Sequence, residues 1–361
     1  MTTLPHHPSR PPVSEPFGRL PDGTEVRRWW LENGGTRLAV LSHGGIVQSL
    51  ETPDRDGRRA NVSLGFRGLD DYLGSRAYFG ALVGRYGNRI AHGWFDLDGT
   101  RHFLSVASGE HTLHGGALGF DRRNWTVHGF ARGTDVGLVL TLTSPHGDMG
   151  FPGTLDVRVV YTLTEGGDWR IDYRAVTDRP TVVNLTSHVY WNLAGESAGS
   201  VDGHELSIAA SRTTPVGTGL IPTGRLAPVA GTPFDFRTAR AIGPGLSADD
   251  PQLRHAGGYD HNWVLDKGVT PTPEPAATLY EPVSGRMLRI ATTEPGVQFY
   301  SGNFLDGTST GSGGRPYRRG DGLCLETQHF PDSPHQPEFP GTVLRPGETY
   351  RSTTVHSFTT L

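Results

Sequence analysis

Polar side chains alternate with apolar ones along the segment from Val182 to Leu193. Such alternation is typical of a β-strand, because successive side chains of a strand point to opposite faces. One face of this predicted strand carries Asn184, Thr186, His188, Tyr190 and Asn192. An imidazole among hydroxyl and amide groups can exchange a proton near neutral pH. His188 is therefore a candidate functional residue, although a polar strand that faces solvent would show the same pattern.

A carboxylate occupies a comparable position in the segment from Gly322 to Phe330. Alternation there places Glu326 on one face with Cys324, Gln328 and Phe330. A thiol and an aromatic ring displace water from a carboxylate, which raises its pKa and makes it a better base near neutral pH. The alternative, a surface glutamate on an edge strand, predicts an ordinary pKa for Glu326.

Two glycine-rich segments offer further groups that can contact a ligand. His114 precedes Gly115 and Gly116, and glycine lets a ligand approach the backbone closely. Asn88 and Arg89 end a second glycine-rich stretch, and the guanidinium fork suits vicinal hydroxyls. Turn formation alone would also explain these glycines.

An acceptor and an amide complete the set of candidate binding residues. Asp260 lies on a loop that begins with Gly257 and Gly258, and Gln298 lies on a predicted strand, Val297 to Tyr300. Sugar hydroxyls donate and accept hydrogen bonds, so they need partners of both kinds.

The elements that would position these residues are short strands joined by turns. The 361 residues include 50 glycines and 27 prolines without a fixed period, which favours turns over long helices. Alternation predicts strands at Val136 to Thr143, Leu155 to Leu163, Trp169 to Val176 and Gly296 to Tyr300, and only Thr238 to Leu246 has the pattern of a helix. We therefore predict an all-β protein in the form of one large antiparallel β-sandwich.

The amino terminus differs in composition from the rest of the chain. Residues 1–17 form a Pro-rich leader that includes His6 and His7, and we predict that it is disordered and does not bind metal. A single domain is predicted for residues 18–361.

Charge and cysteine content narrow the classes of partner. The formal net charge is −4 and the pI is about 6.5, so no basic field attracts nucleic acid or an anionic membrane. The single cysteine cannot form an internal disulfide, and no apolar run is long enough for export or membrane insertion. We expect a cytoplasmic protein, a monomer or homodimer, with a small neutral ligand. Dinucleotide-binding, phosphate-binding and zinc motifs are absent from the sequence.

Taken together, the candidate segments resemble the aldose 1-epimerase (galactose mutarotase) family in sequence and in order. The resemblance runs from about Arg19 to the carboxyl terminus. The stretches that carry it are Gly84 to Ala91, Leu113 to Gly116, Asn184 to Leu193, Tyr259 to Asn262 and Leu325 to Pro334. The resemblance implies a β-supersandwich fold of the galactose mutarotase type, with no metal or organic cofactor.

The resemblance also implies a reaction and a set of roles. The reaction is the interconversion of the α and β anomers of a free hexose such as galactose or glucose. By position, Glu326 resembles the general base and His188 the general acid. Four further residues resemble sugar-binding residues of the family, namely His114, Arg89, Asp260 and Gln298, and Asn88 is added to them. The chain departs from the usual family residues at Gly87, Ser187, Val189 and Trp191, which affects sugar preference and not the reaction.

Three other functions remain open at this point. A hexose-6-phosphate 1-epimerase of the same fold would need a cationic cluster, for which Arg89 and Arg85 are the candidates. A non-catalytic sugar-binding module would not require both Glu326 and His188. A lyase or hydrolase of carbohydrate would be expected to show paired carboxylates in one motif, which this sequence lacks.

Overall fold

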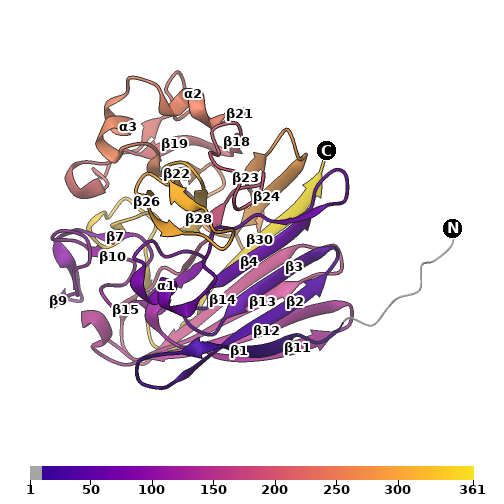
Figure 1. The fold of residues 1–361 in the computed structure, drawn as a ribbon. Coiled ribbons are helices and arrows are strands. Elements are labelled where there is room, and N and C mark those ends of the chain that lie inside the picture. Colours follow the sequence, from indigo (N-terminus) through magenta and orange to yellow (C-terminus); the bar gives the residue numbers. More distant parts are fainter. Residues whose placement is uncertain (1–9) are drawn as a thin grey trace.

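The computed structural model describes residues 10–361, and Figure 1 shows that most of its regular structure is β-strand. The largest sheet has nine strands, with neighbours in this order: β11 (Thr126–Arg132), β12 (Asp135–Ser144), β13 (Leu155–Leu163), β14 (Trp169–Thr177), β30 (Tyr350–Thr360), β24 (Arg286–Thr292), β23 (Glu274–Tyr280), β18 (Glu205–Ile208) and β21 (Arg240–Ala241). These strands pair antiparallel, as the sequence analysis predicted.

Two further large sheets accompany the nine-stranded sheet. One contains β1 (Val13–Arg19), β2 (Glu25–Asn33), β3 (Thr36–Leu41), β4 (Val47–Pro53) and β5 (Arg59–Asn61). The other, with six strands, has the order β17 (Tyr190–Trp191), β28 (Leu323–Gln328), β25 (Gly296–Tyr300), β22 (Asp260–Leu265), β19 (Ala210–Thr214) and β20 (Ala227–Pro228). The all-β, antiparallel architecture predicted from the sequence is confirmed.

Short strand pairs and single-turn helices connect the large sheets. The pairs are β6 (Ala81–Val83) with β16 (Thr186–His188), β7 (Arg89–Ile90) with β10 (Thr112–Leu113), β8 (Trp94–Leu97) with β9 (Thr100–Phe103), β15 (Thr181–Val182) with β29 (Val343–Leu344), and β26 (Asp306–Thr310) with β27 (Pro316–Arg318). The α-helices are α1 (Leu69–Gly74), α2 (Ile242–Leu246) and α3 (Pro251–Ala256), and 3-10 turns occur at Ala91–Gly93, Phe120–Arg122, Asp148–Gly150, Thr218–Leu220 and Ser333–His335.

The individual element predictions can be compared with these bounds. The four strands predicted from alternation are confirmed as β12, β13, β14 and β25. The helix predicted at Thr238 to Leu246 is wrong in its first half, because Arg240 and Ala241 pair with β18 before α2 begins.

The predicted leader is wrong for residues 13–17. Strand β1 begins at Val13 and pairs with β2 at the edge of its sheet. An edge strand tolerates proline, and Pro16 lies beside an irregularity in the pairing. His6 and His7 lie outside the described residues, and the division into a single domain stays a prediction.

Strand β13 shows how the nine-stranded sheet separates its side chains. Residues at every second position are buried: Leu155, Val157, Val159, Tyr161 and Leu163. They share one hydrophobic cluster with Leu31 and Leu38 of the five-stranded sheet and with Leu323 and Leu325 of β28. The side chains between them, including Asp156 and Arg158, point to the opposite and open face of the sheet. The core therefore lies among the three large sheets and leaves one face of the largest sheet accessible.

A buried arginine joins the loops beside this core. The Arg85 side chain is 2% exposed, and its guanidinium group donates to the carbonyl oxygens of Pro152, Gly153 and Ser144 at 2.8 to 3.0 Å. It also donates to the Ser144 hydroxyl at 2.7 Å. Burial lowers the pKa of Arg85 to about 10, so the group remains charged at neutral pH.

We expect Arg85→Leu to lower the free energy of unfolding by about 3 kcal/mol or more, because several buried carbonyl oxygens lose their donor. Urea denaturation followed by tryptophan fluorescence measures this change. The control is Arg289→Leu, which removes an exposed arginine on β24 and should change stability by less than about 0.5 kcal/mol. Equal effects of the two substitutions would contradict the role given to Arg85.

Candidate functional site

A cavity of about 380 Å³ lies against the polar face of β28. Its volume is within the range of about 300 to 1,000 Å³ that small-molecule sites occupy. Six of the seven residues singled out from the sequence line it: Asn88, Arg89, His114, His188, Asp260 and Glu326. These residues come from five separate segments, so only the fold brings them together.

Glu326 lies in the middle of β28, an interior strand of the six-stranded sheet. The side chains of Leu323 and Leu325 enter the hydrophobic core, whereas Cys324 and Glu326 point to the other face. Glu326 is 2% exposed, and its Oε2 atom has no hydrogen-bond partner among the described residues. Burial raises the pKa of Glu326 well above its usual range, with a further increase from the charge of Asp260 and an opposing effect of Arg89. The alternative of a surface glutamate on an edge strand is therefore wrong.

His188 faces Glu326 across the cavity. Its Nε2 atom lies 3.7 Å from Glu326 Oε1, and its Nδ1 atom lies 3.5 Å from Cys324 Sγ. Burial lowers the pKa of His188 to about 4, so the imidazole is neutral at pH 7 in the free protein. The alternative of a solvent-facing strand is also wrong, because His188 is 5% exposed.

The long strand predicted from Val182 to Leu193 is divided in the structure. It forms β15, β16 and β17, with breaks between them. At the first break, the Asn184 side chain donates to the carbonyl oxygens of Gly87 and His329 and accepts from the His329 N–H. These bonds replace pairing within one continuous sheet. His188 and Glu326 thereby come from different sheets and meet at the cavity.

Arg89 and Asp260 form an ion pair at the cavity wall. Arg89 Nη2 lies 3.7 Å from Asp260 Oδ2, and both side chains are 9% exposed. Asp260 also accepts a hydrogen bond of 2.7 Å from Gln298 Nε2. Gln298 itself is absent from the cavity wall. It lies on β25 opposite Asn262 of β22 and Glu326 of β28 in the strand register. This position differs from the direct sugar contact expected from the sequence, and suits a residue that orients Asp260.

His114 and Asn88 hold each other in place beside Arg89 in the cavity wall. The Asn88 N–H donates to His114 Nδ1 at 3.2 Å, and the His114 N–H donates to the Asn88 carbonyl at 3.0 Å. His114 Nε2 therefore carries the ring proton and can donate to a ligand. A side chain at Gly115 would place Cβ 2.0 Å from the Gly84 carbonyl oxygen, so glycine is required for this close approach.

Aromatic side chains complete the cavity, and sequence analysis did not assign them. Tyr78 has its ring centroid 4.6 Å from that of His114, and Tyr300 lies beside Cys324 in the sheet register. Alternation along β25 places Tyr300 on the same face as Gln298 and could have identified it. Tyr78 lies in a loop with φ of 56°, where no periodic pattern exists to indicate it.

Three side chains of the cavity also lie close enough together to hold one metal ion. His114, His188 and Glu326 each offer a ligand atom, and these atoms lie within 4.8 Å of one another. A second such group at the surface contains His92, Glu110 and His111. Proton transfer between oxygen atoms requires no metal, so the chemistry available to the first group includes acid and base catalysis by its side chains alone.

Within residues 10–361, no helix is long and apolar enough to cross a bilayer.

Known proteins with similar sequences and structures identify the family. The family model for aldose 1-epimerase matches residues 27–357. Galactose mutarotase from Homo sapiens is 44% identical over 343 residues, which cover 95% of this chain and 97% of that protein. Aldose 1-epimerase from Escherichia coli K12 is 41% identical over 350 residues, which cover 96% and 99%. The crystal structure of galactose 1-epimerase from Lactobacillus acidophilus has a TM-score of 0.85 at 27% identity and covers 97% and 98% of the two chains. The chain belongs to the aldose 1-epimerase family.

Proposed function

We propose that this protein is an aldose 1-epimerase that interconverts the α and β anomers of free aldohexoses such as galactose and glucose. The observation that carries the proposal is the position of Glu326 opposite His188, at 3.7 Å, in a cavity that also presents hydroxyl-binding groups. Family membership supports the same reaction.

The reaction requires one proton to leave the C1 hydroxyl and one to reach the ring oxygen. The ring C–O bond then breaks to give an open aldehyde, which rotates about the C1–C2 bond and closes on the other face. We assign Glu326 as the base at the C1 hydroxyl and His188 as the acid at the ring oxygen, and their roles reverse on closure. Each transfer contributes on the order of 10²- to 10⁴-fold.

A histidine that acts as the acid at the ring oxygen is expected to be protonated, and the burial of the site modifies that expectation for His188. Desolvation favours the neutral forms of both His188 and Glu326. The reactive form, with a carboxylate at Glu326 and an imidazolium at His188, contains the same number of protons as the form with both groups neutral. A proton that moves across the 3.7 Å gap interconverts them, so burial changes the resting state without preventing the assigned roles.

Cys324 supports either protonation state of the imidazole. Burial raises the pKa of Cys324 well above its usual range, so its thiol stays protonated. A thiol donates and accepts weak hydrogen bonds, and the Cys324 sulfur can therefore partner His188 Nδ1 with or without a ring proton. The contact leaves Nε2 directed at Glu326.

The alternative substrate, a phosphorylated hexose, gains no support from Arg85. The Arg85 guanidinium group donates to interior carbonyl groups and does not line the cavity. The cations in the cavity wall are Arg89, which faces Asp260, and Arg76 at an exposed position.

We retain the cytoplasm as the proposed location and a monomer or homodimer as the proposed oligomeric state.

Purified protein should accelerate the decay of optical rotation of freshly dissolved α-galactose and α-glucose, without changing the final rotation. Polarimetry in parallel samples with and without protein measures this effect. The same assay with α-glucose 6-phosphate tests the alternative substrate. Acceleration confined to the phosphorylated sugar would replace the proposed substrate class, and absence of acceleration with all three sugars would refute the proposed reaction.

Glu326→Gln and His188→Asn should each lower kcat by at least about 10²-fold, because each removes one proton-transfer group while it preserves size and hydrogen bonding. The controls are Glu274→Gln and His128→Asn, which make the same changes at exposed positions on β23 and β11. Turnover near the wild-type value in either site variant would remove that residue from the catalytic pair.

Asp260→Asn and Arg89→Gln should shift the pH dependence of kcat/KM in opposite directions. Asp260 raises the pKa of Glu326 and Arg89 lowers it. Loss of the negative charge therefore moves the limb of the profile that reports the ionisation of Glu326 to lower pH, and loss of the positive charge moves it to higher pH.

Both variants should also raise KM, since we assign both side chains to the sugar hydroxyls. Polarimetry at a series of pH values gives both kcat/KM and KM. The control is Asp235→Asn, which changes a carboxylate outside the cavity. Shifts of the two profiles in the same direction would contradict the electrostatic account, and a loss of turnover without a change in KM would contradict the binding role.

A further inference from the structure

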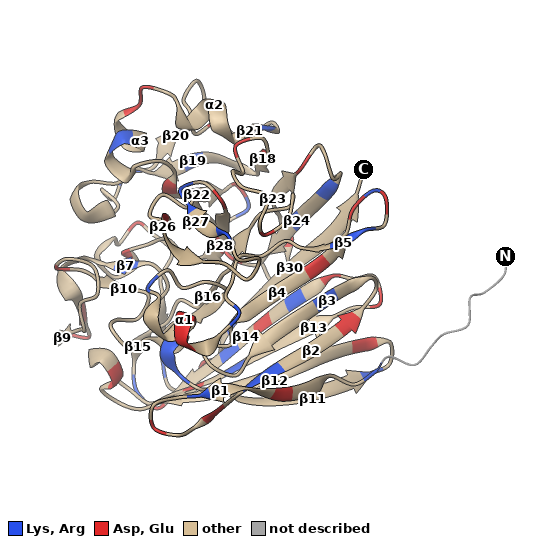
Figure 2. Ribbon diagram, viewed as in Figure 1, with Lys and Arg blue, Asp and Glu red and all other residues tan. Residues whose placement is uncertain are grey.

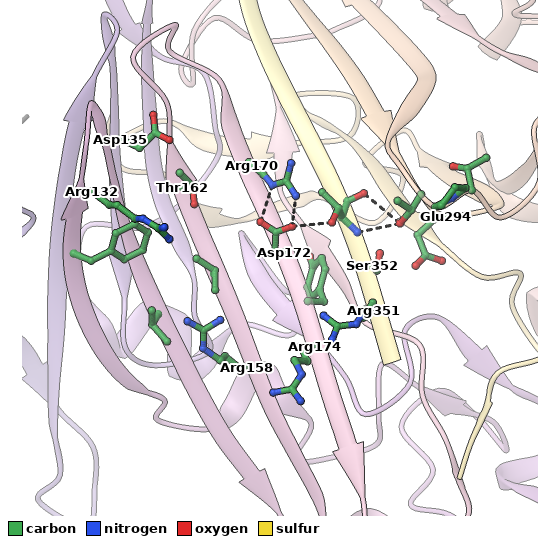
Figure 3. Close-up of a pocket in the computed structure, with 18 of the residues that line it drawn as sticks. Arg132, Asp135, Arg158, Thr162, Arg170, Asp172, Arg174, Glu294, Arg351 and Ser352 are labelled. Carbon is green, nitrogen blue, oxygen red and sulfur yellow. Dashed lines mark hydrogen bonds and ion pairs between the residues drawn. The ribbon is translucent and has the colours of Figure 1, made fainter. Parts of the chain in front are cut away.

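A second and larger cavity lies on the open face of the nine-stranded sheet, as Figure 3 shows. Its volume is about 1190 Å³, and it shares no lining residue with the cavity that contains Glu326. Outward-pointing side chains of β12, β13, β14 and β30 form its floor, and residues 269–271 lie at its margin. We call this cavity the sheet trough. It is independent of the proposed sugar chemistry.

Three arginines cross the floor of the sheet trough in a single row. Arg158 of β13 pairs directly with Arg174 of β14 in the strand register, and Arg174 pairs directly with Arg351 of β30. Residues that lie directly opposite in antiparallel strands have Cα atoms about 4.5 to 5.5 Å apart. The three side chains point to the same face, and Figure 3 shows all three on neighbouring strands of the trough floor.

The row has no acidic partner in the described part of the chain. No hydrogen bond or ion pair joins the side chain of Arg158, Arg174 or Arg351 to another residue in that part. Figure 2 shows that both acidic and basic residues occur along this sheet, so the row is not a consequence of a uniformly basic surface.

The carboxylates nearest the row already have partners. Asp172 accepts two hydrogen bonds from Arg170 at 2.7 Å and one from the Thr353 hydroxyl at 2.7 Å. Asp156 accepts from the Thr143 hydroxyl at 2.6 Å. At the end of the trough, Glu294 is paired with His329 at 2.6 Å.

Like charges directly opposite each other on neighbouring strands destabilise a sheet. Three successive arginines therefore form an unfavourable arrangement unless an anion compensates them. A guanidinium fork binds phosphate oxygens in a bidentate manner, and the strand spacing sets successive forks at a distance that linked phosphoryl groups can span.

We propose that the Arg158–Arg174–Arg351 row binds an anion with two or more linked phosphoryl groups, either inorganic or as part of a nucleotide. One phosphoryl group contacts Arg174 together with a neighbouring arginine, and a second contacts the arginine on the other side. Thr141 of β12 continues the row beside Arg158 and offers a hydroxyl to the same ligand. The apolar side chains of Val139 and Val160 form the adjacent part of the floor, next to Asp172, whose carboxylate is already paired with Arg170.

Isothermal titration calorimetry at low ionic strength tests the proposal with orthophosphate, pyrophosphate, tripolyphosphate, ADP and adenosine as separate probes. Pyrophosphate and tripolyphosphate should bind more tightly than orthophosphate, and adenosine should not bind. Equal affinities for pyrophosphate and ADP identify the phosphoryl groups alone as the ligand, whereas tighter binding of ADP identifies a nucleotide. Absence of binding by all of the phosphorylated probes overturns the proposal.

Arg174→Gln should weaken pyrophosphate binding by at least about tenfold, since the central arginine holds one phosphoryl group together with a neighbouring arginine. The matched control is Arg289→Gln, which removes one exposed arginine from the same sheet outside the trough. Equal weakening in the two variants would indicate nonspecific attraction by net charge and would overturn the site.

Thermal melting separates loss of the site from loss of the fold. Pyrophosphate should raise the Tm of the wild type, whereas Arg174→Gln should be at least as stable as the wild type without anion and should not respond to pyrophosphate. An unchanged response in Arg174→Gln overturns the proposal. Arg158→Gln and Arg351→Gln should show the same loss of response, and they carry the test if Arg174→Gln does not fold.

Discussion

The desolvation of one carboxylate is the constraint on which the site depends. Glu326 is buried beside another acidic residue, Asp260, and both circumstances raise its pKa. A charged group in such surroundings is unfavourable unless other groups compensate it. The compensation comes from Arg89, which lies on β7 and is far from Glu326 in the sequence. Strands β28, β22 and β25 fix Glu326, Asp260 and Gln298 in register. One sheet therefore holds both Glu326 and the neighbouring acid, Asp260, that raises its pKa.

The two faces of β28 explain why a sheet is a suitable support for this chemistry. Leu323 and Leu325 anchor the strand in the main hydrophobic cluster, while the alternate positions face the cavity. A shift of one residue would exchange the two faces, so the packing of the leucines also fixes the direction of Glu326. Elsewhere in the cavity wall, His114 and Asn88 adopt positive φ angles of 51° and 62° and are held by mutual hydrogen bonds. The loops supply binding groups, and the sheet fixes the position of Glu326.

Much of this arrangement could be predicted from the sequence, and the reasons for the failures are physical. Alternation identified β12, β13, β14 and β25, because half-buried strands separate apolar and polar side chains. It failed over Val182 to Leu193, where Asn184 redirects the backbone by side-chain hydrogen bonds that alternation does not reveal. Tyr78 was missed because loop residues show no periodic alternation of polar and apolar side chains. Strand β1 was missed because Pro16 and the prolines before it gave the segment the composition of a disordered leader. Gln298 was found, but its absence from the cavity wall and its hydrogen bond to Asp260 depend on the strand register, which the sequence does not reveal.

The position of Cys324 has a consequence for how the molecule can be observed. It is the chain's single cysteine, it is fully buried, and it touches His188. A thiol reagent can reach this sulfur only when the side chains packed over it move apart, since Cys324 is buried in a hydrophobic cluster with Tyr190 and Tyr300. The rate of labelling therefore reports how often the centre of the site opens to solvent. The chain thus contains an intrinsic probe of motions around β28.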